Sequence, residues 1–174
     1  MSNKEELSVI INEIKKTHPR KWYIKQQVKS LHNSGYNLNN KYHNGNNIMH
    51  YAVKYKINSI IKYLIANGCN PNICNDKYLA PLHLAVEVNN KKAIKILLKN
   101  GADVNLTGEF EQTALHMATI CGNIRLVKIL IDNGADVLVV DEKNLSVLDY
   151  AKDEKNIKII KYLNKKYDIQ EGEK

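Results

Sequence analysis

An internal repeat with a period of about 33 residues constrains the fold of this chain more than any other feature of its sequence. Glycine recurs at this spacing at Gly35, Gly68, Gly101 and Gly134. Three further columns keep the same register: Leu31, Leu64, Leu97, Leu130 and Leu163; Ala52, Ala85, Ala118 and Ala151; and His50, His83 and His116, followed by Asp149. Several columns in one register show that the chain is built from repeats that stack on one another.

Each period contains two short helices followed by a loop. In the period 75–107, apolar residues recur at steps of three and four, which is typical of helices with one apolar stripe: Leu82, Ala85, Ile94, Leu97 and Leu98. Asn89 and Asn90 interrupt this pattern, and Gly101 follows the second helix, where a left-handed residue is favoured. A single helix pair cannot bury its own stripe, so the units must pack against one another.

Two segments carry the motif of a known family. Ala80-Pro81-Leu82-His83-Leu84-Ala85 and Thr113-Ala114-Leu115-His116-Met117-Ala118 match the T-P-L-H-x-A signature of ankyrin repeats, and 47–52 matches it more weakly. The segments 100–105 and 133–137 match the second half of the same repeat. The chain therefore resembles the ankyrin repeat family, and the resemblance implies an all-α solenoid of helix-turn-helix-hairpin units.

The repeat register predicts where the units begin and end. We expect an atypical N-terminal cap of helices over 1–41, three internal repeats at 42–74, 75–107 and 108–140, a C-terminal capping repeat at 141–167, and a disordered tail at 168–174. The first segment has no signature but offers an apolar stripe that suits a cap: Leu7, Ile10, Ile11, Ile14, Ile24, Val28 and Leu31. The last repeat lacks the histidine, and Tyr167 stands where the next glycine would fall.

Neither catalysis nor a bound metal or cofactor is expected. The chain has no phosphate-binding loop of the GxxxxGK type and no GxSxG elbow, and its three cysteines have no CxxC spacing. Histidines one repeat apart would lie about 10 Å apart, whereas zinc ligands lie about 2 Å from the metal. We expect these histidines to bond backbone groups of a neighbouring hairpin, and we expect neither an enzyme nor a small-molecule substrate.

The positive charge of the chain is concentrated toward its N-terminus. The net charge is +8, and the segments 1–41, 42–74 and 75–107 contribute +5, +3 and +2, against −2 and 0 for 108–140 and 141–174. This gradient predicts that a protein partner is acidic where it meets the N-terminal half. Nucleic acid is not expected as a partner, because 24 of the 26 basic residues are lysine and base recognition favours arginine. The alternative is a binder of nucleic acid or of an acidic surface through the basic N-terminal half.

The resemblance implies that a partner binds the hairpin tips and first helices on a concave side. The matching positions are Asp76, Lys77, Leu79, Glu109, Phe110 and Gln112 in the tips, Tyr55, Val88 and Ile120 at the ends of first helices, and Trp22, which lies one period before Tyr55. Solubility favours polar residues at such positions, yet Phe110, Ile120, Leu79, Val88 and Tyr55 are apolar. Exposed apolar patches usually mark interaction sites, so we expect a binding row centred on Phe110 and Ile120. The alternative is that some of these side chains pack against neighbouring hairpins.

Two features of the sequence bear on where the protein acts: its lack of membrane and secretion signals, and its bias toward residues with AT-rich codons. No run approaches the ~20 apolar residues of a membrane span, and no secretory signal opens the chain. We therefore expect no membrane partner and a cytoplasmic protein. Lysine, asparagine, isoleucine and tyrosine are abundant and have AT-rich codons, which suggests an intracellular bacterium, a large DNA virus or a protist. Such a source favours a host-directed role, with delivery to a host cytosol or nucleus by a route that the sequence does not show.

Overall fold

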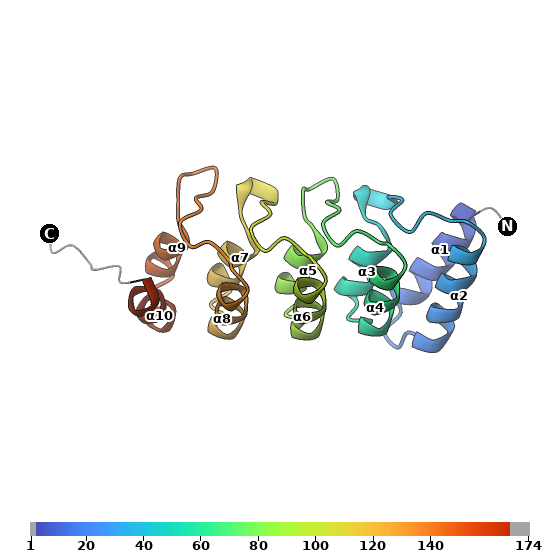
Figure 1. Ribbon diagram of the computed structural model, residues 1–174, viewed down its shortest axis with the longest axis horizontal. Helices are drawn as coiled ribbons and strands as arrows, with labels where there is room; N and C mark the ends of the chain where they lie inside the picture. The colour runs from blue at the N-terminus through green and yellow to red at the C-terminus, as the bar shows by residue number, and fades with distance from the viewer. Residues whose placement is uncertain (1–2, 168–174) are drawn as a thin grey trace, which may run out of the picture. The chain divides into compact units, whose positions relative to one another are not determined.

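The computed structural model describes residues 3–167, and the regular structure in this range is helical (Figure 1). The helices are α1 (Asn3–Ile14), α2 (Lys21–Asn33), α3 (Ile48–Lys54), α4 (Asn58–Ala66), α5 (Pro81–Glu87), α6 (Lys91–Lys99), α7 (Ala114–Ile120), α8 (Ile124–Asp132), α9 (Val147–Asp153) and α10 (Ile157–Tyr167), with short 3₁₀ turns η1 (His43–Gly45) and η2 (Glu109–Glu111). Extended pairing within 3–167 is limited to isolated bridges, from Thr107 to Thr113 and from Val140 to Ser146. The predicted all-α class is confirmed, while the predicted tail 168–174 lies outside the described residues.

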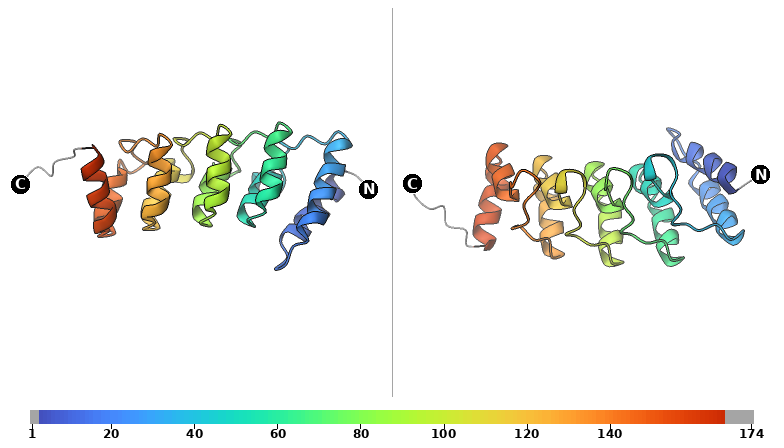
Figure 2. Two further views of the ribbon diagram at one scale, coloured as in Figure 1. Left: turned by 60° about the horizontal axis from the view of Figure 1, so that its bottom comes forward. Right: turned by 90° about the horizontal axis from the view of Figure 1, so that it is seen from above.

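The helices belong to two compact units, Met1–Ala102 (unit 1) and Asp103–Lys174 (unit 2). In unit 1, α3 packs on α4, α5 and α1, while α4 packs beside α2 and α6. In unit 2, α7 packs on α8 and α9, and α10 packs on α9 and α8. First helices thus pack on first helices and second helices on second helices, so that each unit has two helical layers (Figure 2).

The first helix pair of unit 1 buries the apolar stripe that the sequence predicts for a cap. Its seven members are between 0% and 2% exposed: Leu7, Ile10, Ile11, Ile14, Ile24, Val28 and Leu31. They recur at steps of three and four, so they share one side of each helix. α1 contacts α3 and α2 contacts α4, which places this apolar side against the second helix pair.

Glycine and asparagine columns close the loops between repeats. The four periodic glycines have φ between 78° and 89°, a conformation that strains residues with a Cβ: Gly35, Gly68, Gly101 and Gly134. This confirms the left-handed role predicted for Gly101, and the other three glycines share it. The asparagines of a second column reach these glycines from the preceding loop, because the Nδ2 of Asn39 donates to the Gly68 carbonyl at 3.2 Å and the Nδ2 of Asn72 donates to that of Gly101 at 3.0 Å. Asn105 donates to Gly134 in the same way in unit 2, at 3.2 Å.

Candidate functional site

The periodic histidines hold hairpins against first helices. His116 Nδ1 accepts a hydrogen bond from the backbone N–H of Thr113 at 3.2 Å, so its Nε2–H is free to donate to the carbonyl of Leu145, 3.3 Å away. His50 repeats the arrangement in unit 1, where its Nε2 lies 3.0 Å from the carbonyl of Leu79. Both imidazoles are buried. For His50 and His116, the expectation that the periodic histidines bond the backbone of a neighbouring hairpin is confirmed.

Burial of these imidazoles makes stability depend on pH. Burial lowers the pKa of His50 from 6.5 to about 4 and also lowers the pKa of His116. The folded state therefore favours the neutral imidazole. Its burial contributes to the stability of the fold above the unfolded pKa, and this contribution is lost as pH falls from the unfolded pKa toward the lowered folded pKa. For His50 we expect a loss of about 2 kcal/mol in the free energy of unfolding between about pH 7 and about pH 5.

Thermal melting followed by circular dichroism across this range measures the loss. A chain with His50→Gln and His116→Gln is expected to be less stable at neutral pH but to have a flatter pH profile, because neither substituted side chain titrates. A steep profile that persists in this variant would show that other groups cause the acid sensitivity. The buried carboxylates affect stability only at a lower pH than this range, because the pKa of Glu13 and that of Asp141 are both held at about 2.

The hairpin tip of unit 2 exposes an aromatic ring on a strained backbone. Phe110 has φ 59° and is 55% exposed. Its carbonyl accepts the backbone N–H of Glu142 at 3.2 Å, which ties the tip to the next hairpin. In unit 1 the corresponding bond runs from Asp76 N–H to the carbonyl of Asn44, which has φ 57°. Asparagine adopts this left-handed conformation at little cost, whereas a bulky aromatic residue adopts it only with strain.

Gln112, expected as a partner-binding residue, is held inside unit 2. Its Nε2 donates to Tyr150 Oη at 2.9 Å and to Asp141 Oδ2 at 3.3 Å. Asp141 also accepts the backbone N–H groups of Lys143 and Leu145, each at 3.0 Å. Burial opposes the charge on Asp141, but these hydrogen bonds and that of Tyr150 outweigh it and lower its pKa to about 2. The amide of Gln112 therefore stabilises the last hairpin.

The other expected contact residues differ in how far they reach solvent. Ile120 is 37% exposed at the end of α7, and Glu109 is half-buried in η2. In unit 1, Asp76 and Lys77 are exposed, and three apolar residues are half-buried: Tyr55, Leu79 and Val88. These three side chains are therefore partly covered, whereas Phe110 and Ile120 are exposed.

Tyr78 is a tip residue that the sequence analysis missed. It is 70% exposed and has φ 59°. In the hairpin tip at 75–79 of unit 1 it therefore presents an aromatic ring from a left-handed position, as Phe110 does in unit 2. The signal that could have revealed it was an aromatic residue inside the polar turn that begins at Asn75, whose side chain accepts the backbone N–H groups of Lys77 and Leu79.

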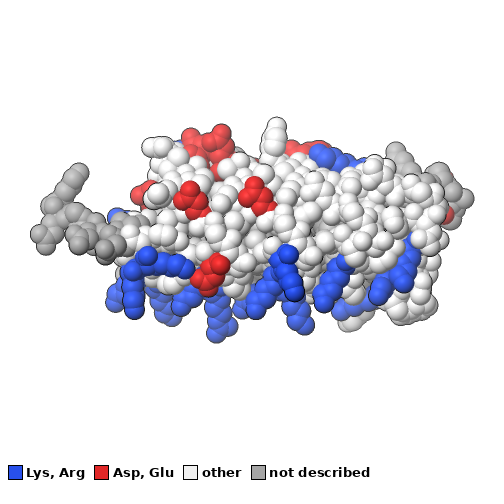
Figure 3. All heavy atoms as spheres, viewed as in Figure 1, with Lys and Arg blue, Asp and Glu red and all other residues white. Residues whose placement is uncertain are grey.

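Charge in each unit is segregated by helix layer as well as along the chain (Figure 3). In unit 1 the second helices carry eight lysines and no acidic residue: Lys21, Lys25, Lys29, Lys62, Lys91, Lys92, Lys95 and Lys99. The five acidic residues of unit 1 lie on first helices or in a hairpin: Glu5, Glu6, Glu13, Asp76 and Glu87. In unit 2, α8 and α10 carry six basic residues and one acidic residue, Asp132. The net charge of a whole repeat does not reveal this separation, because it adds the charges of both helices and the hairpin.

Trp22 lies on a second helix, and the expectation that it extends the row of first-helix ends is wrong. α2 begins at Lys21, one turn earlier than the repeat register of α4 predicts, so Trp22 is in the first turn of α2 and is 69% exposed. Tyr55, one period later, is instead the C-cap residue of α3.

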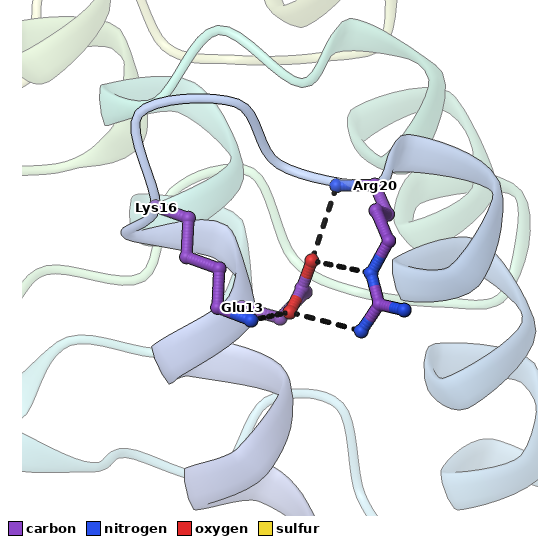
Figure 4. A network of polar contacts seen from close by, with 3 residues as sticks. All are labelled: Glu13, Lys16 and Arg20. Carbon is purple, nitrogen blue, oxygen red and sulfur yellow. Dashed lines mark hydrogen bonds and ion pairs between the residues drawn. The ribbon is translucent and has the colours of Figure 1, made fainter.

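Glu13 organises the turn that precedes α2 (Figure 4). Its Oε1 accepts the backbone N–H of Arg20 at 3.2 Å and the Nε–H at 3.0 Å, and its Oε2 pairs with Lys16. The bonds from Arg20 and then Lys16 lower the pKa of Glu13 to about 2. These contacts fix Arg20, the N-cap residue of α2, next to the end of α1 and thereby set where α2 starts.

The described residues offer little for metal chemistry or for spanning a bilayer. Within 3–167, no group of three or more His, Cys, Asp or Glu side chains is arranged to hold a metal ion. None of the helices in this range is long and apolar enough to cross a membrane.

The comparisons with known proteins agree with the geometry of the repeats. A family model for ankyrin repeats, with three copies, matches residues 23–108 and 82–172. The comparison with curated proteins gave no match. The two matched segments span most of the chain, including the histidine bridges and glycine turns described above, and the chain therefore belongs to the ankyrin repeat family.

Proposed function

We propose that this chain recognises a partner protein through its hairpin tips and the adjoining first helices, without catalysing a reaction. Ankyrin repeats are in general modules of protein–protein interaction, which supports the broad class of this function. The lysine- and asparagine-rich composition supports a host-directed factor of an intracellular bacterium or a large DNA virus, acting in a host cytosol or nucleus.

The exposed ring of Phe110 is the observation that carries the proposal. A left-handed conformation costs an ordinary residue about 1–2 kcal/mol, and a side chain that is 55% exposed recovers little of this through burial. Phenylalanine therefore does not stabilise the fold at this tip, since Asn44 makes the same turn in unit 1. Exposed aromatic side chains are typical anchors of protein interfaces, and Tyr78 supports the same interpretation for unit 1.

A pocket in unit 2 adds a second point of attachment. It has a volume of about 470 Å³ and lies between the hairpin residue Leu145 and one side of α9. Leu145 and Tyr150 supply apolar walls, and Asp149, Lys152 and Asp153 line its polar part. This mixture suits a partner side chain with an apolar stem and a polar end. Over unit 1, whose sixteen basic and five acidic residues give a net charge of +11, we expect the partner to be acidic.

Site-specific photo-crosslinking tests the proposal. A photoreactive phenylalanine analogue at position 110 is expected to capture a partner from cells in which the protein acts, because the ring lies in the interface. The matched control carries the same analogue at Leu138, which is 76% exposed and follows α8 in the same unit. Capture at 138 without capture at 110 would place the interface elsewhere and contradict the proposal.

A further inference from the structure

The second helices of unit 1 form a face with one sign of charge. Lys29, Lys62 and Lys95 follow one another at the repeat period and hold the same place on α2, α4 and α6. α4 packs beside both neighbours, so consecutive members of this row are about 10 Å apart. Since no acidic residue lies on these three helices, their charges repel one another, and the repulsion favours a multivalent anionic partner.

An exposed tryptophan belongs to the same face. Trp22, Lys25 and Lys29 follow one another at steps of three and four on α2, on a different side of the helix from the buried Ile24 and Val28. Tryptophan is enriched at the interface between water and lipid, where its apolar ring and polar N–H are both accommodated. Lysine extends its ammonium group to the same level while its stem stays close to apolar surroundings.

The chemistry of the face favours a lipid surface over nucleic acid. The three helices carry no arginine, the residue that best recognises bases and phosphates in two contacts at once. Binding of single strands also requires aromatic rings on which bases stack. The tyrosine rings of α2 and α4 are half-buried and already lie beside cations: the ammonium of Lys29 is 5.9 Å from the centre of Tyr63, and the guanidinium of Arg20, which pairs with Glu13, is 4.6 Å from that of Tyr23.

We propose that the second-helix face of unit 1, formed by the exposed sides of α2, α4 and α6, docks on the surface of an anionic phospholipid bilayer. Each lysine near such a surface contributes about a fivefold gain in affinity, and Trp22 adds an interfacial contact. This contact departs from the sequence-based expectation of no membrane partner, which rested on the lack of a spanning segment, because docking at the surface requires no spanning helix. The face lies on the second helices and leaves the hairpin tips available for a protein.

The fluorescence of Trp22 tests the proposal directly, because it is the only tryptophan of the chain. The full chain is titrated with vesicles of phosphatidylcholine alone or mixed with phosphatidylserine, and binding is also measured by co-sedimentation. We expect a blue shift and co-sedimentation with the mixed vesicles, no change with phosphatidylcholine alone, and release as salt screens the charges. Absence of binding to the mixed vesicles at low salt would overturn the proposal.

A matched pair of variants separates the face from the total charge. Lys62→Gln with Lys95→Gln is expected to weaken vesicle binding about thirtyfold, whereas Lys41→Gln with Lys54→Gln removes the same charge from a loop and a first helix and is expected to have little effect. Melting temperatures verify that both variants fold. Equal losses would show that net charge alone binds the lipid, and tighter binding of a DNA or RNA oligonucleotide that is lost in Lys62→Gln/Lys95→Gln would reassign the face to nucleic acid. Either result would overturn the proposal while leaving crosslinking at position 110 unaffected.

Discussion

A chain that begins at residue 42 is expected to aggregate or to melt at a much lower temperature than the full chain. α1 and α2 cover one side of α3 and α4, and removing them exposes apolar surface of these two helices, whose buried aliphatic side chains are at most 1% accessible in the full chain. Each such side chain contributes about 1.5–3 kcal/mol when it is buried. The seven apolar residues of the cap are lost as well, and a change of even a few kcal/mol is a large fraction of the ~5–15 kcal/mol by which a typical domain is stable.

Circular dichroism melting and light scattering measure this effect. A point variant gives the same information without removing chain: Ile11→Ala is expected to destabilise by about 2–5 kcal/mol, because Ile11 is 1% exposed and its loss leaves a cavity. Val9→Ala on the same helix is the matched control, since Val9 is 41% exposed and the change is expected to have little effect. If the shortened chain stays monomeric and as stable as the full one, the first two helices do not act as a cap.

Phe110→Asn is expected to weaken partner binding at least tenfold while leaving the melting temperature unchanged or raising it. Buried aromatic anchors commonly contribute about 2 kcal/mol or more to binding, and asparagine relieves the strain at φ 59°. The two effects have opposite signs, so a general loss of structure cannot produce them together. Once crosslinking has identified the partner, calorimetry of the purified pair measures the affinity, and differential scanning calorimetry of the free chain measures stability.

Leu138→Asn serves as the control for this experiment. It replaces another exposed apolar residue of unit 2 with the same polar residue, and Leu138 is even more exposed than Phe110, at 76% against 55%. We expect normal binding. If Phe110→Asn lowers the melting temperature by several degrees, the ring belongs to the packing of the hairpin and not to an interface. If both variants bind normally, the partner uses another face of the protein.

Features that depend on local or periodic patterns could be predicted from the sequence alone. The spacing of apolar residues gives each helix one buried side, as the cap stripe from Leu7 to Leu31 shows. A glycine after a helix adopts the left-handed conformation because few other residues can, and the four periodic glycines do so. A histidine at a fixed place in a repeat meets the same backbone carbonyl of the following hairpin, as His50 and His116 do. Such relations recur from one repeat to the next, and counting along the sequence reveals them.

Which polar and aromatic side chains remain free depends instead on tertiary contacts. Gln112 is engaged because Asp141 and Tyr150, 29 and 38 residues away in sequence, meet its amide. Trp22 lies outside the expected row because α2 starts one turn early, where Glu13 binds Arg20. Tyr78 lies at a hairpin tip because the Asn75 side chain stabilises the turn around it. The lysines of α2, α4 and α6 form one face because these helices pack side by side. Exposure depends on contacts between distant residues, whereas the repeat pattern specifies only which sides of the helices are buried.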